Sequence, residues 1–391
     1  MAEKRRVAIT GIGVVSPVGI GQEAYWQGLL APQPSGERRA HDFDPKTCYD
    51  DPKSIRRADR FEQFAVCAAK EALAQSGVPD ASPGRIGVLL GTGIGGIQSH
   101  EDQTLVLDKK GGRRVSPFTI PMMMANAAAA AISIEHGFQG PCETISTACA
   151  SGTHSIGQAA RWIGWGQCDV VVAGGSEAGM TPIAINGFTN MKALSRSGVS
   201  RPFDERRDGF ILSEGAGVLV LEEWERASKR GATILGELLG SASLADAHHI
   251  TAPSPAGLGA IRCMKHALQD AQLQPREIAH INAHGTSTTL NDAAEAIGIG
   301  EVFGFPGPIV TSIKGVTGHS LGAAGALEAV AVLLSMQHRL IPPTDGLERV
   351  DCEFPKIDLV QKEARAWTPG PSLSNSFGFG GHNGTLVIGP A

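Results

Sequence analysis

The chain has 391 residues, of which 42% are hydrophobic and 19% are charged, and its formal net charge is -5. This length and apolar content can fill the core of one large two-part unit, and they exclude a disordered or fibrous protein. The net negative charge argues against a protein that wraps nucleic acid through its overall field.

The cysteines and the start of the chain bear on location. The seven cysteines include no CxxC pair, and their spacing predicts neither a disulfide framework nor a zinc knuckle. This usage favours a reducing cytoplasm. The segment after Met1 leads into Val7–Ile12 without a continuous apolar stretch for export, and we expect no segment to be long and apolar enough to span a membrane.

In the first part of the chain, short β-branched runs alternate with longer segments of helical period. This pattern is typical of an α/β layered fold with buried strands. We expect strands at Val7–Ile12, Ile86–Leu90, Glu143–Thr147 and Val170–Ala173. We expect helices at Phe61–Ser76, which Gly77 ends, and at Ala150–Trp165.

After Gly231 the same alternation begins again. Strands are predicted at Ile234–Leu239, His280–Ala283 and Ile309–Ile313, and helices at Leu258–Ala271, from Asp292 onward, and at Leu321–Met336. No repeat of residue identity accompanies this order. The order of elements nevertheless predicts two comparable halves, 1–234 and 235–391, joined near Leu235.

A cysteine lies between an expected strand and an expected helix, in the segment TACASG at 147–152. The free N–H groups and the positive dipole end of that helix would stabilise a thiolate, so we expect a lowered pKa for Cys149. The small neighbouring residues leave room for a substrate. The alternative is that Cys149 is only a small core residue, but its position at a strand-to-helix elbow favours a nucleophile.

Two histidines follow expected strands of the second half. His284 lies in NAHGTST at 282–288, and His319 lies in KGVTGHSLGAAG at 314–325. Loops at the carboxyl ends of strands line the active crevice of α/β enzymes, and glycines let backbones approach closely. A single histidine is more often a satisfied surface or core residue. Two at matching strand ends favour a catalytic pair.

A glycine-rich segment, NSFGFGGHNG at 375–384, separates two apolar runs near the C-terminus. It could be an ordinary hairpin turn. Phe377 and Phe379 on so permissive a backbone favour a gate over an apolar channel, or a backbone N–H donor at a reacting carbonyl.

Together, these four segments resemble the thiolase-fold β-ketoacyl-acyl carrier protein synthases, most closely the KAS II type of bacterial fatty acid synthesis. The resemblance runs from Val7 to Ile388 in unbroken order. It implies an α/β, five-layered αβαβα thiolase fold built from two similar halves, the first carrying the nucleophile and the second the catalytic histidines. It also implies an acyltransferase that condenses malonyl-carrier protein with a bound acyl chain, without a metal or redox cofactor.

The resemblance also implies residue roles. Cys149 is the acyl-accepting nucleophile, and His284 and His319 are the paired catalytic histidines. Lys314 is the active-site lysine, organised with Glu328. Phe379 is the gating phenylalanine, and its backbone N–H joins that of Cys149 as oxyanion donor. The substrate-binding positions are Thr286, Thr288, Ile94 and Phe377.

The partner of such an enzyme is an acidic acyl carrier protein, which would bind basic residues near the tunnel mouth. The matching cations are Arg56, Arg57, Arg113, Arg114 and Arg196, although such runs are usually solvated surface. The stretch Phe118–Met124 matches a dimer-crossing region. A homodimer, or a heterodimer with a related subunit, is therefore implied, with neither a nucleic acid nor a membrane as partner.

Two features depart from the KAS II pattern. The loop at Ser197–Ser200 is shorter than expected, and His382 stands where many members have threonine. Both concern specificity more than mechanism, and the acyl chain length stays open. A ketosynthase of polyketide or other specialised synthesis also stays open. A non-catalytic subunit like a chain-length factor is disfavoured by the intact Cys149, and two histidines disfavour the thiolase and KAS III branches.

A rival of another class is a dinucleotide-binding dehydrogenase, because GTGIGG at 91–96 satisfies GxGxxG after an expected strand. The glycines of that motif should open a helix, yet Ile97–Asp108 is polar and predicted to be irregular. The dehydrogenase would also leave Cys149, His284 and His319 without a role, so we disfavour it.

Overall fold

The computed structural model describes residues 4–77 and 80–391, so part of the expectation about the start of the chain lies outside the described residues. The first half forms a sheet in the order β4-β3-β5-β6-β1. Its strands are β1 (Val7–Ser16), β3 (Ile86–Gly91), β4 (Cys142–Ile145), β5 (Val170–Glu177) and β6 (Gly215–Glu223), and β2 (Gly19–Ile20) pairs with the end of β1.

The second half repeats this arrangement in the order β9-β8-β13-β14-β7. Its strands are β7 (Gly236–Ala245), β8 (His280–Asn282), β9 (Ile309–Thr311), β13 (Ser372–Gly378) and β14 (His382–Gly389), with β11 (Asp358–Leu359) added beyond β9. A small separate sheet pairs β10 (Leu340–Ile341) with β12 (Arg365–Ala366).

In the first half, β6 is antiparallel to β1 and to β5, and β3 is parallel to β4 and to β5. In the second half, β14 is likewise antiparallel to β7 and to β13, and β8 is parallel to β9 and to β13. A short antiparallel pairing of β1 with β7 joins the two half-sheets. Each half thus has the same strand order and the same strand directions.

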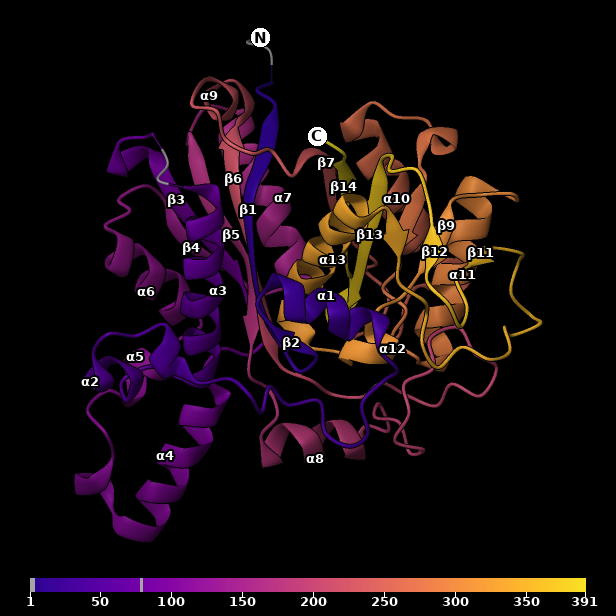
Figure 1. The fold of residues 1–391 in the computed structure, drawn as a ribbon. Helices are drawn as coiled ribbons and strands as arrows, with labels where there is room; N and C mark the ends of the chain where they lie inside the picture. The colour runs from indigo at the N-terminus through magenta and orange to yellow at the C-terminus, as the bar shows by residue number, and fades with distance from the viewer. Residues whose placement is uncertain (1–3, 78–79) are drawn as a thin grey trace.

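Helices complete five layers, which run from left to right in Figure 1. Helices α3 (Arg60–Ser76) and α6 (Ala127–His136) cover the outer face of the first sheet. Helices α7 (Ser151–Gly164) and α13 (Ala324–His338) lie between the sheets. Helix α10 (Leu258–Ala271) packs on the outer face of the second sheet, and α11 (Thr289–Phe303) packs beside it in the same apolar cluster. The order helix, sheet, helix, sheet, helix is the thiolase fold that the resemblance predicted.

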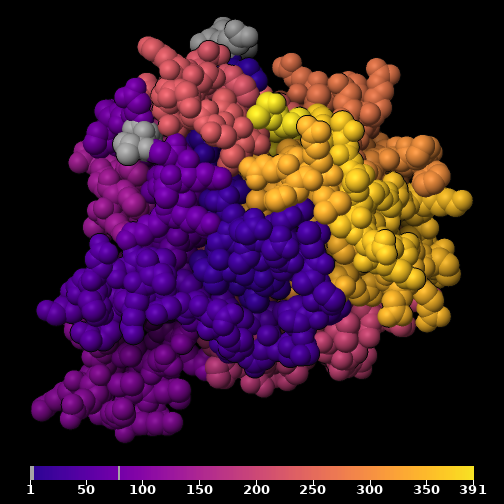
Figure 2. All heavy atoms as spheres, viewed as in Figure 1, coloured from indigo at the N-terminus to yellow at the C-terminus, as the bar shows by residue number. Residues whose placement is uncertain are grey.

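The remaining helices are shorter or lie at the surface: α1 (Gln22–Leu30), α2 (Pro52–Ile55), α4 (Ile97–Lys110), α5 (Thr119–Met123), α8 (Pro182–Asn190), α9 (Trp224–Lys229) and α12 (Lys314–Thr317). The N-terminal segment around α1 lies across one face of the molecule, between the first half and the yellow C-terminal part (Figure 2). The predicted strands and helices are confirmed, with ends that move by a few residues.

The central helix α13 carries apolar residues on all sides, and every residue from Ala324 to Met336, including Glu328, is buried. The window Leu321–His338 has a mean hydropathy of 1.3, so by length and composition it could cross a membrane. The expectation that no such segment exists was therefore wrong. Of this window, 89% is buried inside the protein, as befits a core helix between two sheets.

Helix α4 corrects a second expectation, because Ile97–Lys110 is a regular helix that begins directly after Gly96. Only Ser99 of this helix is buried. A helix on the surface needs no continuous apolar stripe, so its polar sequence did not reveal it.

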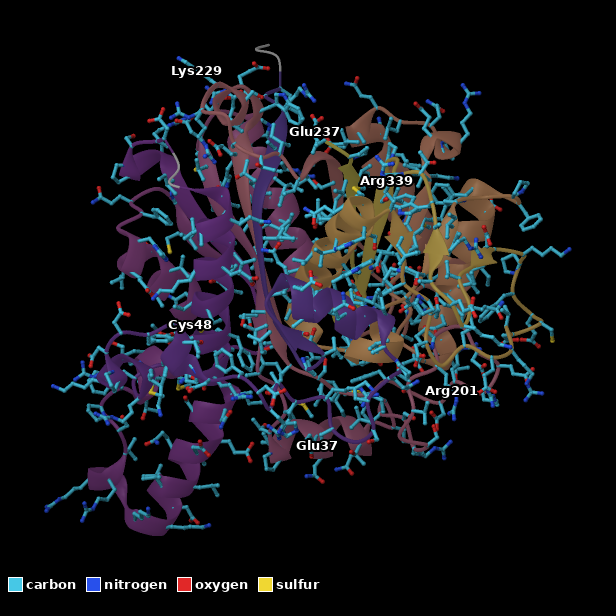
Figure 3. All side chains as sticks on the ribbon, in the orientation of Figure 1. Glu37, Cys48, Arg201, Lys229, Glu237 and Arg339 are labelled. Atoms are coloured by element: carbon cyan, nitrogen blue, oxygen red, sulfur yellow. A yellow bond between two sulfur atoms is a disulfide. The ribbon has the colours of Figure 1, made fainter. Side chains whose placement is uncertain are left out.

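The cysteines correct a third expectation. Cys48, labelled in Figure 3, is joined by a disulfide to Cys67 of α3, across a sequence separation of 19 residues. The loop that contains η1 (Pro45–Thr47) folds back onto α3 and brings the two sulfurs together. No spacing motif announces such a contact, because it depends on the path of the loop.

Candidate active site

Cys149 lies on a tight turn between β4 and α7. Ala148 has a φ of +50°, which is uncommon for a residue with a side chain. The Ser151 hydroxyl stabilises the turn, accepting from the N–H of Thr147 at 2.8 Å and donating to the carbonyl of Ala148 at 2.6 Å. This elbow presents Cys149 to an internal cavity while only 7% of the residue is exposed.

The end of β13 packs closely against this elbow. A Cβ on Gly378 would lie 3.0 Å from the amide nitrogen of Cys149 and 3.1 Å from the carbonyl oxygen of Thr147, so glycine fits best there. The close approach brings the N–H groups of Phe379 and Cys149 to the sulfur, where both lower its pKa. These two N–H groups are suitably placed to receive an oxyanion that forms beside the sulfur.

The two histidines meet at Cys149. Nε2 of His319 lies 3.0 Å from Sγ of Cys149. The rings of His284 and His319 have centroids 5.3 Å apart and are nearly perpendicular, at 85°. The ligand atoms of these three residues lie within 4.8 Å of one another, a spacing that a metal ion could also use.

Burial controls the protonation of this cluster. It raises the pKa of Cys149 to about 11, although the charge of Lys314 and the two N–H groups lower it in part. The expected lowering was therefore wrong, because burial of the thiolate outweighs the helix terminus. Burial and the charge of Lys314 hold the pKa of His284 and of His319 well below the usual value. The resting site thus holds a thiol and two neutral imidazoles.

Lys314 connects the histidines to a buried carboxylate. Its ammonium forms an ion pair with Glu328, and both side chains are 2% exposed. It also donates to the carbonyl of His284 at 2.7 Å and lies 3.3 Å from Nδ1 of the same residue. Because an ammonium can only donate, Nδ1 accepts, and the proton of neutral His284 is on Nε2.

Two buried glutamates support the site and were not predicted. Glu295 accepts from the N–H groups of His284 and Gly285, each at 2.8 Å. Glu177 accepts from the N–H groups of Gly93 at 2.6 Å and of Gly322 at 3.0 Å. Burial raises the pKa of each carboxyl to about 7. Glu177 ends an apolar strand, which was a usable signal, whereas nothing in the helical sequence around Glu295 marks it.

The cavity has a volume of about 400 Å³. It brings together the predicted catalytic residues Cys149, His284, His319 and Phe379 with the predicted substrate positions Ile94, Thr286, Thr288 and Phe377. The hydroxyls of Thr286 and Thr288 lie 3.0 Å apart. The cavity is also lined by apolar residues that the sequence did not single out, among them Phe188, Met191, Phe210 and Leu321.

The predicted carrier-binding arginines are all exposed. Arg56 and Arg57 follow α2, Arg113 and Arg114 lie in η3 (Gly112–Arg114), and Arg196 lies in a separate loop. Arg57 stacks over the ring of Phe118 at 4.5 Å. These five residues do not line the cavity as the structure describes it. An exposed cation that does line it, Lys192, was not predicted.

The two departures from the KAS II pattern lie at the rim of the site. The short loop is tied together by Asp208, which accepts from the Ser195 hydroxyl at 2.6 Å and from the N–H of Ser197 at 2.9 Å. His382 begins β14 opposite Ala245, and the next residue, Asn383, lines the cavity and donates to Asp246 at 2.7 Å.

Comparison with protein families gives matches over both halves. Residues 32–227 match the N-terminal domain of beta-ketoacyl synthase, and residues 235–348 match its C-terminal domain. The chain belongs to the β-ketoacyl synthase family. As a member it is a thiolase-fold acyltransferase, as the resemblance predicted.

Individual relatives cover the whole chain. The 3-oxoacyl-(acyl-carrier-protein) synthase 2 of Synechocystis is 44% identical, over 99% of this chain and 98% of its own. The solved ishigamide ketosynthase/chain length factor is 33% identical with a TM-score of 0.92, over 99% of this chain and 100% of its own. A type II polyketide ketosynthase, solved with its acyl carrier protein and bound to the hexaketide, is 30% identical with a TM-score of 0.90, over 100% of both chains.

The dehydrogenase alternative is not supported, although the helix it requires is present. The N–H groups of Gly93 and Ile94 bind the carboxylate of Glu177, at 2.6 and 3.2 Å. In a dinucleotide-binding loop, such N–H groups would have to face a pyrophosphate instead. In this β-ketoacyl synthase, the carboxylate of Glu177 occupies these N–H groups, so they do not face a ligand.

Proposed function

We propose that this β-ketoacyl synthase lengthens fatty acyl chains by decarboxylative condensation with malonyl-carrier protein, using Cys149 as the nucleophile. The observation that carries the proposal is the contact of Sγ of Cys149 with Nε2 of His319 at 3.0 Å, with His284 facing both at the cavity. A thiol, two imidazoles and two N–H donors are the groups that this condensation requires.

Acyl transfer comes first. Neutral His319 accepts the proton of the Cys149 thiol as sulfur attacks the acyl thioester carbonyl. The developing oxyanion accepts hydrogen bonds from the N–H groups of Cys149 and Phe379. As the tetrahedral intermediate collapses, the carrier thiolate leaves and takes the proton back from His319. The result is a thioester on Cys149 and a free carrier thiol.

Decarboxylation and condensation follow. The malonyl thioester loses carbon dioxide, and the electron pair of the broken C–C bond moves into an enolate whose oxygen accepts a hydrogen bond from Nε2–H of His284. The enolate carbon then attacks the acyl carbonyl on Cys149, and the same two N–H groups receive the second oxyanion. Its collapse forms the 3-oxoacyl thioester and expels the thiolate of Cys149, which takes up one proton from solvent and restores the thiol.

Lys314 stabilises the arrangement that decarboxylation requires. Its contact with Nδ1 of His284 keeps the proton of that ring on Nε2, where it can be donated to the enolate oxygen. Its ion pair with Glu328 balances the buried charge. Phe379, next to Gly380 with its φ of +80°, would act as the gate between the acyl and malonyl sides.

We also propose the partners and the location. Among the described residues, strand β4 pairs only with β3, and Cys142 and Glu143 at its start are exposed. Nearby helices expose Ile120 at 61% and Ile134 at 81%. An unpaired edge beside apolar surface fits a second copy of the chain, so a homodimer is proposed. The acidic carrier would bind near Lys192 and the predicted arginines. The enzyme, built from the two halves 1–234 and 235–391, would act in the cytoplasm.

The test is a condensation assay with acyl-carrier protein and malonyl-carrier protein, in which product and protein-bound acyl group are followed by mass. Wild type should give a 3-oxoacyl product and an acyl adduct, and Cys149→Ala should give neither. Cys352→Ala, which removes an exposed cysteine, is the matched control and should behave as wild type. A chelator should leave the rate unchanged, because the proposed chemistry needs no metal at Cys149, His284 and His319.

Other results would redirect the assignment. A product carrying several unreduced keto groups would indicate polyketide synthesis. Purified wild type that forms neither adduct nor product would rule out a self-sufficient synthase and indicate a requirement for a second, related subunit.

A further inference from the structure

Arg38 is among the largest fully buried side chains of the protein, at 1% exposure. Within the described residues its guanidinium has no ion-pair partner and donates only to neutral oxygens. Nε donates to the carbonyl of Val316 at 3.2 Å, Nη1 to that of Gly36 at 3.0 Å, and Nη2 to Oε1 of Gln33 at 3.3 Å. Burying a charge costs free energy, so an arginine kept in this position calls for an explanation.

The Val316 carbonyl belongs to α12, the single helical turn between Lys314 and His319. Gly318 ends that turn with a φ of +70°, and a Cβ there would lie 3.0 Å from Cγ of Arg38. The stem of Arg38 therefore packs against the turn that leads into His319, while its guanidinium binds a carbonyl within α12. One side chain contacts both parts of the segment.

A second set of bonds fixes the other end of α12. The Ser200 hydroxyl donates to the carbonyl of Lys314 at 2.8 Å. Gln33 donates to the carbonyl of Ser200 at 3.2 Å and to Asp345 at 2.9 Å, and its oxygen accepts from Arg38. Glu37 and Arg201, the sequence neighbours of Arg38 and Ser200, are labelled at the lower part of Figure 3, the side on which α12 lies in Figure 1.

We propose that Arg38 is a positioning residue that fixes α12, so that Lys314 reaches His284 while His319 reaches Cys149. The inference rests on the roles proposed above for Lys314 and His319. Arg38 touches neither substrate nor sulfur, and it acts through the backbone of α12.

Lys314 begins α12 and His319 lies two residues beyond its end, and the two side chains have different partners. A rigid connection between them therefore matters. Nζ of Lys314 must stay near Nδ1 of His284, and Nε2 of His319 must stay near Sγ of Cys149. A shift of about 1 Å in such a contact can reduce a rate by about 100-fold. The planar guanidinium binds three oxygens in fixed directions, which the single ammonium of lysine cannot reproduce.

The experiment compares Arg38→Lys and Arg38→Met with wild type and with Arg230→Gln. Arg230 is also a largely buried arginine, 16% exposed, but it pairs with Glu222, and neither residue lines the described cavity. Its loss should destabilise the fold without moving α12. For each variant we would measure the melting temperature, kcat and KM of condensation, and the pH dependence of Cys149 alkylation by iodoacetamide.

We expect both Arg38 variants to lower kcat by about 10- to 100-fold with KM nearly unchanged. The alkylation profile should shift as well, because the thiol loses its fixed contact with His319. Arg230→Gln should lower the melting temperature but keep the wild-type kcat and profile. Arg38→Lys keeps the charge and most of the stem, so it provides the test if Arg38→Met does not fold.

Three outcomes would overturn the proposal. The first is a wild-type kcat and alkylation profile in Arg38→Lys. The second is an equal loss of kcat in Arg230→Gln at the same loss of melting temperature, which would make the effect one of general stability. The third is a His319→Ala variant with the wild-type alkylation profile and the wild-type kcat, which would refute the proposed role of His319 together with that of Arg38. An impaired His319→Ala beside unaffected Arg38 variants would refute the Arg38 inference alone.

Discussion

The two halves of the molecule share a strand order but divide the chemistry unequally. In the first half, β4, the edge strand of the half-sheet, leads into the elbow of Cys149. In the second half, the corresponding strand, β9, leads into α12 with Lys314 and His319, and the neighbouring β8 leads into His284. Equivalent strand ends thus carry the proposed nucleophile in one half and the proposed proton-transfer groups in the other.

This difference shows what each half lacks by itself. The elbow raises the pKa of Cys149 through burial, and the groups that offset this burial include Lys314 and the N–H of Phe379, both from the second half. Glu177 of the first half binds Gly93 in its own half and Gly322 in the other. The thiol can become a nucleophile only where the two sets of strand ends meet.

The largest effect is expected on the nucleophile side. Cys149→Ala should abolish both the acyl adduct and condensation, because no other described cysteine lines the cavity. Intact-protein mass after incubation with acyl-carrier protein measures the adduct. An adduct that persists in this variant would place the nucleophile elsewhere.

On the opposite side, His319→Ala should slow acylation by about 100- to 10,000-fold, the usual contribution of a positioned general base. The thiol has a pKa raised to about 11 and would then have to lose its proton to solvent. Stopped-flow acylation measures the rate. His284 forms no hydrogen bond with the sulfur, so His284→Ala should mainly slow the release of carbon dioxide. Equal effects of the two variants on acylation would contradict this division of roles.

Loss of one member of the buried ion pair should destabilise the fold. Lys314→Met leaves Glu328 buried without its partner, which should cost about 3–5 kcal/mol of unfolding free energy. The double variant Lys314→Met with Glu328→Gln removes both charges and should recover part of this loss. Urea unfolding measures all three proteins, and a double variant no more stable than Lys314→Met would show that the charge of Glu328 is not the cause.

The glutamate that bridges the halves predicts a dependence on pH. Burial raises the pKa of Glu177 from about 4.5 to about 7. The folded state therefore binds this proton more tightly than the unfolded state. Its contribution to stability is full below about pH 4.5 and is lost as the pH rises through about 7. Between about pH 5 and about pH 8, the free energy of unfolding should fall less in Glu177→Gln than in wild type. An equal dependence of this free energy on pH in the two proteins would argue against the raised pKa of Glu177.

The smallest effect is expected at the mouth of the cavity. Lys192→Ala should raise KM for carrier-linked substrates severalfold, because a rim cation mainly affects the encounter with an acidic partner. Added salt should reduce the difference between variant and wild type. A short acyl thioester without carrier protein is the control substrate and should show no change. Arg196→Ala, outside the cavity lining, tests whether the predicted patch contributes as well.

Much of the fold could be predicted because buried strands are short and rich in β-branched residues, as at Val170–Ala173. Helix α4 was missed because a surface helix with polar faces has no apolar stripe to detect. The disulfide of Cys48 with Cys67 was missed because a loop path brings its partners together. Sequence patterns report local periodicity and burial, and these two features depend on neither.

The core of the site was predictable for a different reason. Cys149, His284 and His319 lie in glycine-rich segments at strand ends, and the segments together resemble one family. The residues that hold these side chains in place could not be predicted. Glu295 binds the backbone of His284 from a different element, and Arg38 binds Val316, which is distant in sequence. The pKa of Cys149 was predicted with the wrong sign, since position at a helix start does not reveal how completely the thiol is removed from water.

The central layer has a consequence for how the chain can be divided. Helix α13, which comes from the second half, packs on β6 and β5 of the first, and α7 of the first half packs on β14 and β7 of the second. Each half therefore covers the sheet of the other. Expressed alone, either half would expose an apolar sheet face to water and would be expected to aggregate. The two halves are therefore expected to fold only together, because the central layer belongs to the cores of both.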